Sequence, residues 1–313
     1  MIVVTVVIPT YQRRDSLREV LLTLSRADFD PARFEVIVSI DGSDDGTEEM
    51  LKGVNVPYSL HWTHGPNAGP GAARNRGAAL AQGDFLLFLD DDILATPPLL
   101  GQHLAAHPSA DGRTVGLGRV ETFQPAALSP WERYLSARYD EHYEKLAQPG
   151  YQLTFWDCLS GSLSMPRALF EWSGGFDASF AAAKHDDIEF GYRLAKMDAE
   201  FIYQPDALAY HRFVKSIDAG LHDAWVDGQS TRQLAEQYPE LRQTLITERR
   251  AHYRGLAAPL LRWATASSVR HARLLALGER WLRRVNWLPL IISRPFCQLA
   301  YHLHFWQGVQ TKT

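Results

Sequence analysis

The sequence is poor in cysteine. Its 313 residues include only Cys158 and Cys297, which lie far apart and in no spacing typical of a metal site. This excludes a small scaffold held together by disulfide bonds, because such chains are rich in cysteine. A reducing compartment, most simply the cytoplasm, is therefore expected.

Long hydrophobic runs are also missing. No stretch reaches the ~18 consecutive apolar residues that indicate a membrane-spanning helix. The apolar segment Ile2–Ile8 follows Met1 without a basic region or a cleavage site of small residues, so it predicts a buried first strand and not a signal peptide. With 46% hydrophobic and 22% charged residues, the composition is typical of a globular chain, and its length fits one large domain with an appendage.

Charge is unevenly distributed along the chain. Residues 1–214 contain 18 Lys and Arg against 29 Asp and Glu, whereas residues 215–313 contain 14 against 7. The net charge of −4 thus combines an acidic part with a basic part, and we expect two domains with different roles, 1–214 and 215–313. Because the whole chain is acidic, nucleic-acid binding is not expected.

Short apolar runs alternate with helical patterns in the first half. Strands are expected at Val3–Ile8, Phe34–Ile40, Ser59–Trp62 and Phe85–Leu89. Helices are expected at Asp15–Ser25, Thr47–Leu51 and Gly71–Ala81. This alternation predicts an α/β fold with a mostly parallel sheet flanked by helices.

The second half is less regular. Helices are expected at Ser129–Ala147, in a short segment that has Pro166 in its first turn, and at Asp186–Met197. Two separate strands are expected at Glu200–Tyr203 and Ala207–Tyr210. From Asp218 onward the pattern is helical, which predicts a helical C-terminal extension.

Acidic residues follow two of the expected strands directly. Asp41 comes after the second strand, and Asp90, Asp91 and Asp92 come after the strand Phe85–Leu89. Ligands of parallel sheets bind beyond the carboxyl ends of the strands, and Mg²⁺ is held by carboxylates together with substrate phosphates. The cluster therefore indicates a metal and diphosphate site, although it could also be a solvated acidic turn. Asp41 could contact a nucleobase or ribose, or simply form a turn with Gly42.

Three other segments carry candidate chemistry. The small-residue stretch Gly69–Gly77 opens a helix and includes Arg74, which suits phosphate binding but equally suits close packing on the sheet. Asp186 and Asp187 begin another helix, where carboxylates complement the helix dipole or could include a general base. His211 could be a metal ligand or a structural histidine.

Taken together, these residues resemble glycosyltransferase family 2, the inverting enzymes with a GT-A fold. The order and spacing of the motifs match over about residues 1–214, and the series is specific although each motif alone is weak. The motifs are Val6–Tyr11 with Arg13, Asp41–Thr47, Asn67–Gly69, Ala73–Gly77, Phe88–Asp92, Gly174–Asp177 and Asp186–Arg193.

The resemblance implies a role for each matching residue. The nucleotide of the donor would be held by Pro9, Thr10, Tyr11, Arg13, Asp41, Arg74, Asp90 and Asp91. Asp92 would bind Mg²⁺ or Mn²⁺, with His211 as a further ligand, and Asp187 would be the catalytic base. The acceptor site would be bordered by Gly175, Phe176, Asp177 and Asp186.

The sequence departs from the family pattern at two positions. Ile40 stands where the family commonly has a first Asp, so Asp41 would bind the base alone. The acidic pair is Asp186-Asp187 in place of the usual Glu-Asp. The shorter side chain keeps the charge, so these departures affect the nucleobase assignment more than the mechanism.

The function implied by the resemblance is metal-dependent transfer of a sugar, most commonly from a UDP-linked donor, to a hydroxyl of a glycan or lipid-linked acceptor in cell-surface glycan synthesis. A non-catalytic nucleotide-sugar-binding or scaffolding protein is an alternative. A sugar nucleotidyltransferase is another, but the segment after the first strand, Pro9–Arg13, lacks the Gly-rich basic loop of those enzymes.

The basic extension mixes arginine with tryptophan and leucine. A helix with one basic and one Trp/Leu face can lie in a membrane interface and bind anionic lipids, which would place the enzyme at the inner face of the cell membrane. Alternatively, the extension packs its apolar residues on the catalytic domain or on another subunit. The residues concerned are Arg249, Arg250, Arg254, Arg262, Arg270, Arg273, Arg280, Arg283, Arg284, Arg294, Trp263, Trp281, Trp287, Trp306 and Leu288–Ile292.

Overall fold

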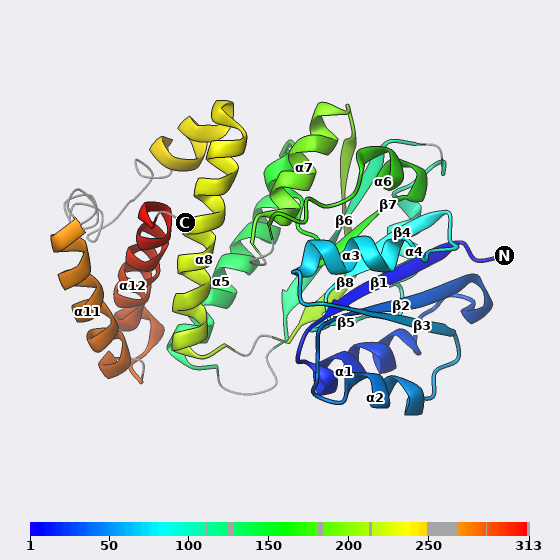
Figure 1. Ribbon diagram of the computed structural model, residues 1–313, viewed down its shortest axis with the longest axis horizontal. Coiled ribbons are helices and arrows are strands. Elements are labelled where there is room, and N and C mark those ends of the chain that lie inside the picture. The colour runs from blue at the N-terminus through cyan, green and yellow to red at the C-terminus, as the bar shows by residue number, and fades with distance from the viewer. Residues whose placement is uncertain are drawn as a thin grey trace. The chain divides into compact units, whose positions relative to one another are not determined.

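The apolar segments expected as strands belong to one eight-stranded sheet in the computed structural model of the protein (Figure 1). The structure describes residues 1–110, 112–123, 128–180, 184–212, 215–248, 268–285 and 287–311. The chain divides into two units, residues 1–123 with 139–212 and residues 124–138 with 213–313.

The sheet lies in the first unit, with strand order β3-β2-β1-β4-β7-β6-β8-β5. The strands β3, β2, β1 and β4 pair in parallel with one another, and β6 pairs in parallel with β8. Strand β7 is antiparallel to both β4 and β6, and β5 is antiparallel to β8. Their bounds are β1 Val4–Thr10, β2 Phe34–Asp41, β3 Ser59–Gly65, β4 Phe85–Leu89, β5 Ile93–Ala95, β6 Thr114–Thr122, β7 Ser162–Pro166 and β8 Glu200–His211. The α/β fold is confirmed, with uninterrupted parallel pairing over four strands.

Helices cover both faces of this sheet. Residues of α1, α2 and α4 share a core with one face, and residues of α3, α6 and α7 share a core with the other. The bounds are α1 Arg14–Leu24, α2 Thr47–Gly53, α3 Pro70–Ala78, α4 Leu99–Ala105, α6 Arg167–Ser173 and α7 Asp186–Lys196, with short 3₁₀ turns at Pro31–Arg33 and Phe155–Asp157.

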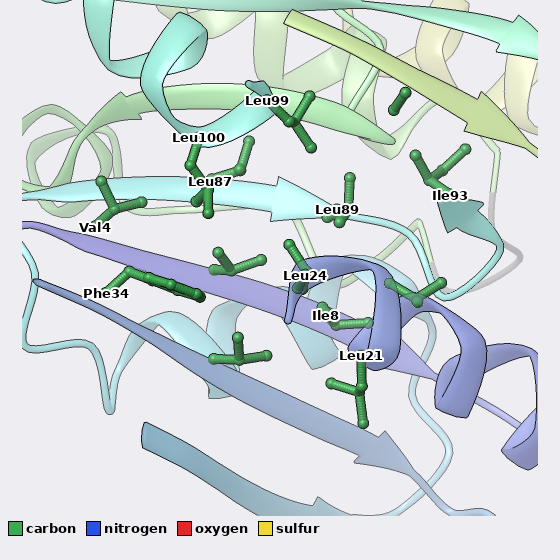
Figure 2. Packing of buried hydrophobic residues seen from close by; sticks show 14 of the residues in the cluster. Val4, Ile8, Leu21, Leu24, Phe34, Leu87, Leu89, Ile93, Leu99 and Leu100 are labelled. Atoms are coloured by element: carbon green, nitrogen blue, oxygen red, sulfur yellow. The ribbon is translucent and has the colours of Figure 1, made fainter. Parts of the chain in front are cut away.

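The first strand is buried on both sides because its side chains alternate between the two cores. Val6 and Ile8 pack in the core of α1, while Val7 packs in the core of α3. Figure 2 shows α1 in front of β1, with the labelled Leu21 and Leu24 on either side of Ile8. A strand buried on both faces reads as a continuous β-branched run, which is why the sequence pattern identified it.

Four elements of the first unit carry no clear sequence pattern and were not expected, namely β5, α4, β6 and β7. Glycines interrupt the apolar run of β6, and β7 alternates serine with apolar residues. Pro166 is the last residue of β7 and the N-cap of α6, so the expectation that it sits in the first helical turn was wrong.

The last strand of the unit corrects a second expectation. The two strands expected around Pro205 are one continuous strand, β8. Its register against β6 shifts between Gln204 and Leu208, so the proline lies in a bulge and does not end the strand.

The second unit is helical among the residues that the structure describes. It contains α8 Ile217–Gln237, Pro239–Leu241, Gln243–Glu248, α11 Ser268–Val285 and α12 Leu290–Gln310. The helix α5, Pro130–Leu146, is divided between the units at Arg138 and Tyr139. In the described part of the chain, no helix has the length and hydropathy needed to cross a membrane.

The helices α8 and α12 cross at two glycines. A Cβ atom added at Gly308 would lie 1.9 Å from the Trp225 carbonyl oxygen, and one added at Gly228 would lie 1.9 Å from the Phe305 carbonyl oxygen. The two backbones therefore pack directly against each other, and neither position can hold a larger residue without separating the helices.

We predict that Gly308→Ala destabilises the protein by at least about 1–3 kcal/mol, because the added methyl group has no room. The matched control is Gly278→Ala on α11, where an added Cβ meets no atom closer than 3.5 Å. That substitution should be neutral or stabilise by about 0.5–1 kcal/mol, since alanine favours a helix over glycine. Urea unfolding of both variants checks this, and equal midpoints would contradict the close helix crossing.

Candidate active site

The candidate site lies where the loops after β1 and β4 meet. The chain places β2 on one side of β1 and β4 on the other, which makes the carboxyl end of β1 the switch point of the parallel strands. The two loops are joined here, since the Thr10 hydroxyl donates a hydrogen bond to Asp91 Oδ2 at 2.8 Å.

Asp91, the middle acid of the cluster, faces the protein interior. Arg13 Nη1 lies 3.1 Å from its Oδ1, and the Ser16 hydroxyl donates to its backbone oxygen at 2.8 Å. Burial raises the pKa of Asp91 to about 7, although Arg13 and Thr10 oppose this shift. Asp91 thus fastens the loop after β4 to the end of β1, and its predicted contact with the nucleotide stays a prediction.

Asp92 contacts both Arg13 and His211. The antiparallel pairing of β5 with β8 sets Ile93 opposite His211, which brings the imidazole Nε2 to 3.3 Å from Asp92 Oδ2. Arg13 Nη1 forms an ion pair with the same oxygen. Burial alone would raise the pKa of Asp92, but the neighbouring His211 and Arg13 hold it well below its usual range.

Asp92 and His211 fit a divalent cation as a pair of ligands. A carboxylate oxygen and an imidazole nitrogen about 3 Å apart can occupy neighbouring positions around one ion, and both donor types suit Mn²⁺. Among the described residues, no group of three or more His, Cys, Asp or Glu side chains could hold a metal ion. For Mg²⁺, substrate phosphates and water are the usual ligands beside one or two carboxylates.

Arg74 connects the first acid of the cluster to α7. This buried side chain donates from Nη2 to Asp90 Oδ1 at 2.6 Å and from Nη1 to Asp186 Oδ2 at 2.9 Å. Burial lowers the pKa of Arg74, but the surrounding carboxylates outweigh it and keep the guanidinium charged. The structure thus brings together three residues that the sequence assigned to three separate motifs.

Asp187 lies beside this bridge in the first turn of α7. Its Oδ1 accepts a hydrogen bond from the Ile188 backbone N–H at 2.8 Å. Burial raises the pKa of Asp187, while His185 and Arg74 lower it, and the net direction is upward. Burial likewise raises the pKa of Asp186 to about 6, against the effect of Arg74. A raised pKa suits a carboxylate that must take a proton near neutral pH.

Asp41, at the end of β2, is held by the protein itself. Its carboxylate accepts hydrogen bonds from the backbone N–H groups of Ala68 and Gly69, the latter at 2.8 Å, and from Arg76 Nη2 at 2.9 Å. These contacts fix the loop that opens α3. The predicted contact of Asp41 with a nucleobase stays a prediction.

The segment predicted to border the acceptor is held by Asn75, a motif residue to which the sequence assigned no role of its own. Asn75 Nδ2 donates to the Phe176 carbonyl at 2.8 Å, and its Oδ1 accepts from the Phe176 N–H at 2.8 Å. Gly175 has a positive φ of 73°, and a Cβ there would lie 2.5 Å from Asn75 Oδ1. Asp177 caps the next turn by accepting from the Ser179 N–H at 2.9 Å.

Other site residues differ in exposure. Pro9 is buried within β1, whereas Tyr11 is 49% exposed in the loop that follows. No sequence motif indicated Gly161. Its carbonyl oxygen accepts a hydrogen bond from the Asp90 N–H at 3.2 Å, and a Cβ atom added at Gly161 would lie 3.1 Å from Asp90 Oδ2. Asn75 and Arg76 stand inside the motif Ala73–Gly77, so the motif marked them without revealing their partners.

Acidic residues at the carboxyl ends of the parallel strands β2 and β4, on either side of β1, are typical of α/β proteins that bind their ligand at the switch point. A family model described as "Glycosyl transferase family 2" matches residues 5–171, more than half of the sequence. The chain belongs to this family, and the predicted resemblance is confirmed.

Two solved structures share the fold. The mannosyltransferase PcManGT from Pyrobaculum calidifontis, in complex with GDP-Man and Mn²⁺, has a TM-score of 0.60 at 21% identity and covers 98% of this chain and 85% of its own. The S. aureus TarS fragment 1–349 in complex with UDP-GlcNAc has a TM-score of 0.54 at 17% identity, over 97% of this chain and 90% of that one.

The curated relatives are more similar in sequence but longer. Validoxylamine A glucosyltransferase from Streptomyces hygroscopicus subsp. limoneus is 33% identical over 218 residues, 61% of this chain and 47% of that protein. The protein of the same name from S. hygroscopicus subsp. jinggangensis is also 33% identical, over 50% of its length. The chain therefore spans about half the length of these relatives.

We predict that Arg74→Met lowers the free energy of unfolding by about 3–5 kcal/mol, because Asp90 and Asp186 lose their shared cation. Arg119→Met, which removes an exposed pair with Glu121, is the control and should change stability by about 0–1 kcal/mol. Adding Asp186→Asn to Arg74→Met should recover part of the loss, as measured by urea unfolding. A similar change in both single variants would show that the bridge is unimportant.

Proposed function

We propose that the protein is an inverting, metal-dependent glycosyltransferase that moves a sugar from a nucleoside diphosphate sugar to an acceptor hydroxyl. The single observation that carries this proposal is the bridge in which the buried Arg74 joins the partly exposed Asp90 to the buried Asp186. It holds the acids after β4, which we assign to the donor, next to the acids of α7, which we assign to the acceptor. Family membership supports the transferase class.

In the proposed reaction Asp187 is the general base. It takes the proton from the acceptor hydroxyl, whose oxygen bonds to the anomeric carbon while the bond to the diphosphate breaks on the opposite face. The configuration at that carbon is thereby inverted, and the nucleoside diphosphate leaves. The raised pKa of Asp187 supports this role, because it makes the carboxylate a better proton acceptor.

The chain's own residues prepare the donor side. Asp92 and His211 would hold Mg²⁺ or Mn²⁺, and the bound ion would stabilise the negative charge that grows on the leaving diphosphate. Pro9, Thr10 and Tyr11 would border the nucleotide, as would Arg13, Asp41 and Asp90. Arg13, which is half-exposed and paired with Asp92, could also turn towards the diphosphate.

The donor and acceptor are proposed from the relatives. One structural neighbour is in complex with UDP-GlcNAc and another with GDP-Man and Mn²⁺, and we favour a UDP-linked donor for this chain. A curated relative, TarS of Staphylococcus aureus, is named a poly(ribitol-phosphate) beta-N-acetylglucosaminyltransferase. By analogy we propose a glycan or lipid-linked acceptor in cell-surface glycan synthesis.

We place this activity in the cytoplasm, at the inner face of the membrane. The two cysteines support a reducing compartment, because both are buried free thiols. Peripheral membrane contact by the second unit would bring the enzyme to a lipid-linked acceptor.

The two rival functions have less support. A non-catalytic binding protein would have no need for a carboxylate of raised pKa, Asp187, beside the bridge of Asp90, Arg74 and Asp186. A nucleotidyltransferase would need a Gly-rich basic loop after β1, where this chain has Gln12 in a left-handed conformation that binds the loop of β2 through Ser43.

We predict that Asp187→Asn retains donor binding but lowers the turnover number by a factor of ~10²–10⁴, the usual contribution of a general base. Asp198→Asn makes the same change just beyond the far end of α7, at an exposed residue with a positive φ that asparagine tolerates, and should retain activity. The rate at which UDP is released from UDP-sugars measures the turnover of both variants. Transfer at the native rate by Asp187→Asn would refute its role.

Calorimetric titration with a panel of nucleoside diphosphates, with Mn²⁺ or with EDTA, tests the donor site. We expect one diphosphate to bind with Mn²⁺, and Asp92→Asn to weaken that binding at least tenfold because an ionised ligand is lost. Asp28→Asn, at an exposed acid shortly after α1, is the charge-matched control and should bind normally. If no diphosphate binds the native protein, the scaffolding alternative gains support.

A further inference from the structure

One face of α11 exposes a mixed basic and apolar stripe. Leu277, Arg280, Trp281 and Arg284 are spaced at intervals of three and four residues, so they lie on the same side of the helix. All four are exposed, with half of the Trp281 surface accessible. Large apolar side chains exposed in succession are unusual on a surface that contacts only water.

The stripe continues onto α12. The Trp281 ring stacks on Phe296, with ring centroids 6.2 Å apart and an interplanar angle of 21°. Ile292 lies one helical turn before Phe296 and is half-exposed, and Trp287, between the two helices, is 79% exposed. We call Leu277, Arg280, Trp281, Arg284, Trp287 and Ile292 the Trp/Arg surface.

The opposite faces of these helices are already used for packing. Leu282 of α11 and Cys297 and Ala300 of α12 are buried in a common core. Gly278 packs against Leu303 of α12. The exposed residues are therefore not an incompletely buried core, because the core side of the same helices is filled.

The charges of this region favour a negatively charged partner. Arg283 forms an ion pair with Asp218, and Glu279 Oε1 is hydrogen-bonded to His304 Nε2 at 2.9 Å. Neither Arg280 nor Arg284 has an ion pair with any residue that the structure describes. The surface thus combines cations with two exposed tryptophans.

We propose that the Trp/Arg surface binds the face of an anionic lipid bilayer. Tryptophan indoles prefer the interface between headgroups and acyl chains, where Leu277 and Ile292 can also bury their side chains. Arginine guanidinium groups pair with lipid phosphates, and each basic residue near an anionic surface strengthens binding. This deepens the proposed function by naming the surface that brings the enzyme to a lipid-linked acceptor.

Sedimentation with sucrose-loaded vesicles tests the proposal on the full chain. We expect binding to vesicles of phosphatidylcholine with phosphatidylglycerol, and at least tenfold weaker binding to phosphatidylcholine alone. Arg280→Gln with Arg284→Gln should weaken binding to the anionic vesicles about 25-fold, at about fivefold per arginine. Trp281→Ser with Trp287→Ser should weaken it by at least tenfold, since the interfacial anchors are lost.

Matched controls on the first unit distinguish binding by the Trp/Arg surface from a general effect of removing positive charge or exposed tryptophan. Arg18→Gln with Arg26→Gln removes two exposed arginines, and Trp172→Ser removes a tryptophan that is 58% exposed. Both controls should bind vesicles like the native chain. Equal loss of binding in the control and test variants, or no binding by the native chain, would overturn the proposal.

Two further outcomes are distinguishable. If the native chain sediments as a dimer without lipid and Trp281→Ser with Trp287→Ser makes it a monomer, a second copy and not a membrane covers the surface. Nucleoside diphosphate binding in the same variants reports on the proposed active site separately. If a Trp/Arg variant no longer binds vesicles but binds nucleotide like the native chain, the membrane role of the Trp/Arg surface is supported. If the native chain itself binds no nucleotide, that result counts only against the transferase assignment.

Discussion

The arrangement of the candidate site depends on one guanidinium group. Asp90, Asp186 and Asp187 come from loops and helices far apart in the chain, and their negative charges repel one another in a partly buried space. Arg74 lies between them and donates to Asp90 and Asp186 at once, which a lysine could not do with the same planar geometry. The close approach of α3 that places Arg74 there requires small residues, since a side chain at Gly77 would collide with Val7 and one at Gly71 would press on Phe176.

The sequence predicted the parts of the fold that have a strong pattern. The strands β1, β2 and β4 are buried and mostly apolar, and β4 has the expected bounds. β1 continues two residues beyond the expected end at Ile8, and β2 continues one residue beyond Ile40. The strands β6 and β7 escaped notice because Gly116, Gly118 and the serines of β7 weaken the apolar signal that distinguishes a strand from a loop. Their place in the sheet depends on neighbours distant in the chain, which periodicity cannot show.

In the candidate site, too, the sequence predicted some features and not others. Strand ends located Asp41 and Asp90–Asp92, because carboxyl ends of parallel strands meet at one edge whatever their register. The partners of these acids could not be predicted. The contact of His211 with Asp92 depends on the antiparallel register of β5, a strand of three residues, and the pairing of Asp41 with Arg76 depends on how α3 packs. Residue types were thus readable from the sequence, whereas contacts between motifs required the packed sheet.

The division of α5 between the two units affects how the chain can be shortened. Trp131, Tyr134 and Leu135 lie in the first part of this helix and are buried in a core with Leu221 and Ala224 of α8. A truncation after Arg212 would keep the three residues but delete that core, leaving two aromatic rings and a leucine side chain without the surface that covers them. Such a fragment would expose the apolar face of the first part of α5 to solvent, which makes it prone to aggregate. The basic C-terminal region is therefore not a detachable module, and domain exchanges within the family would have to transfer residues 124–138 together with it.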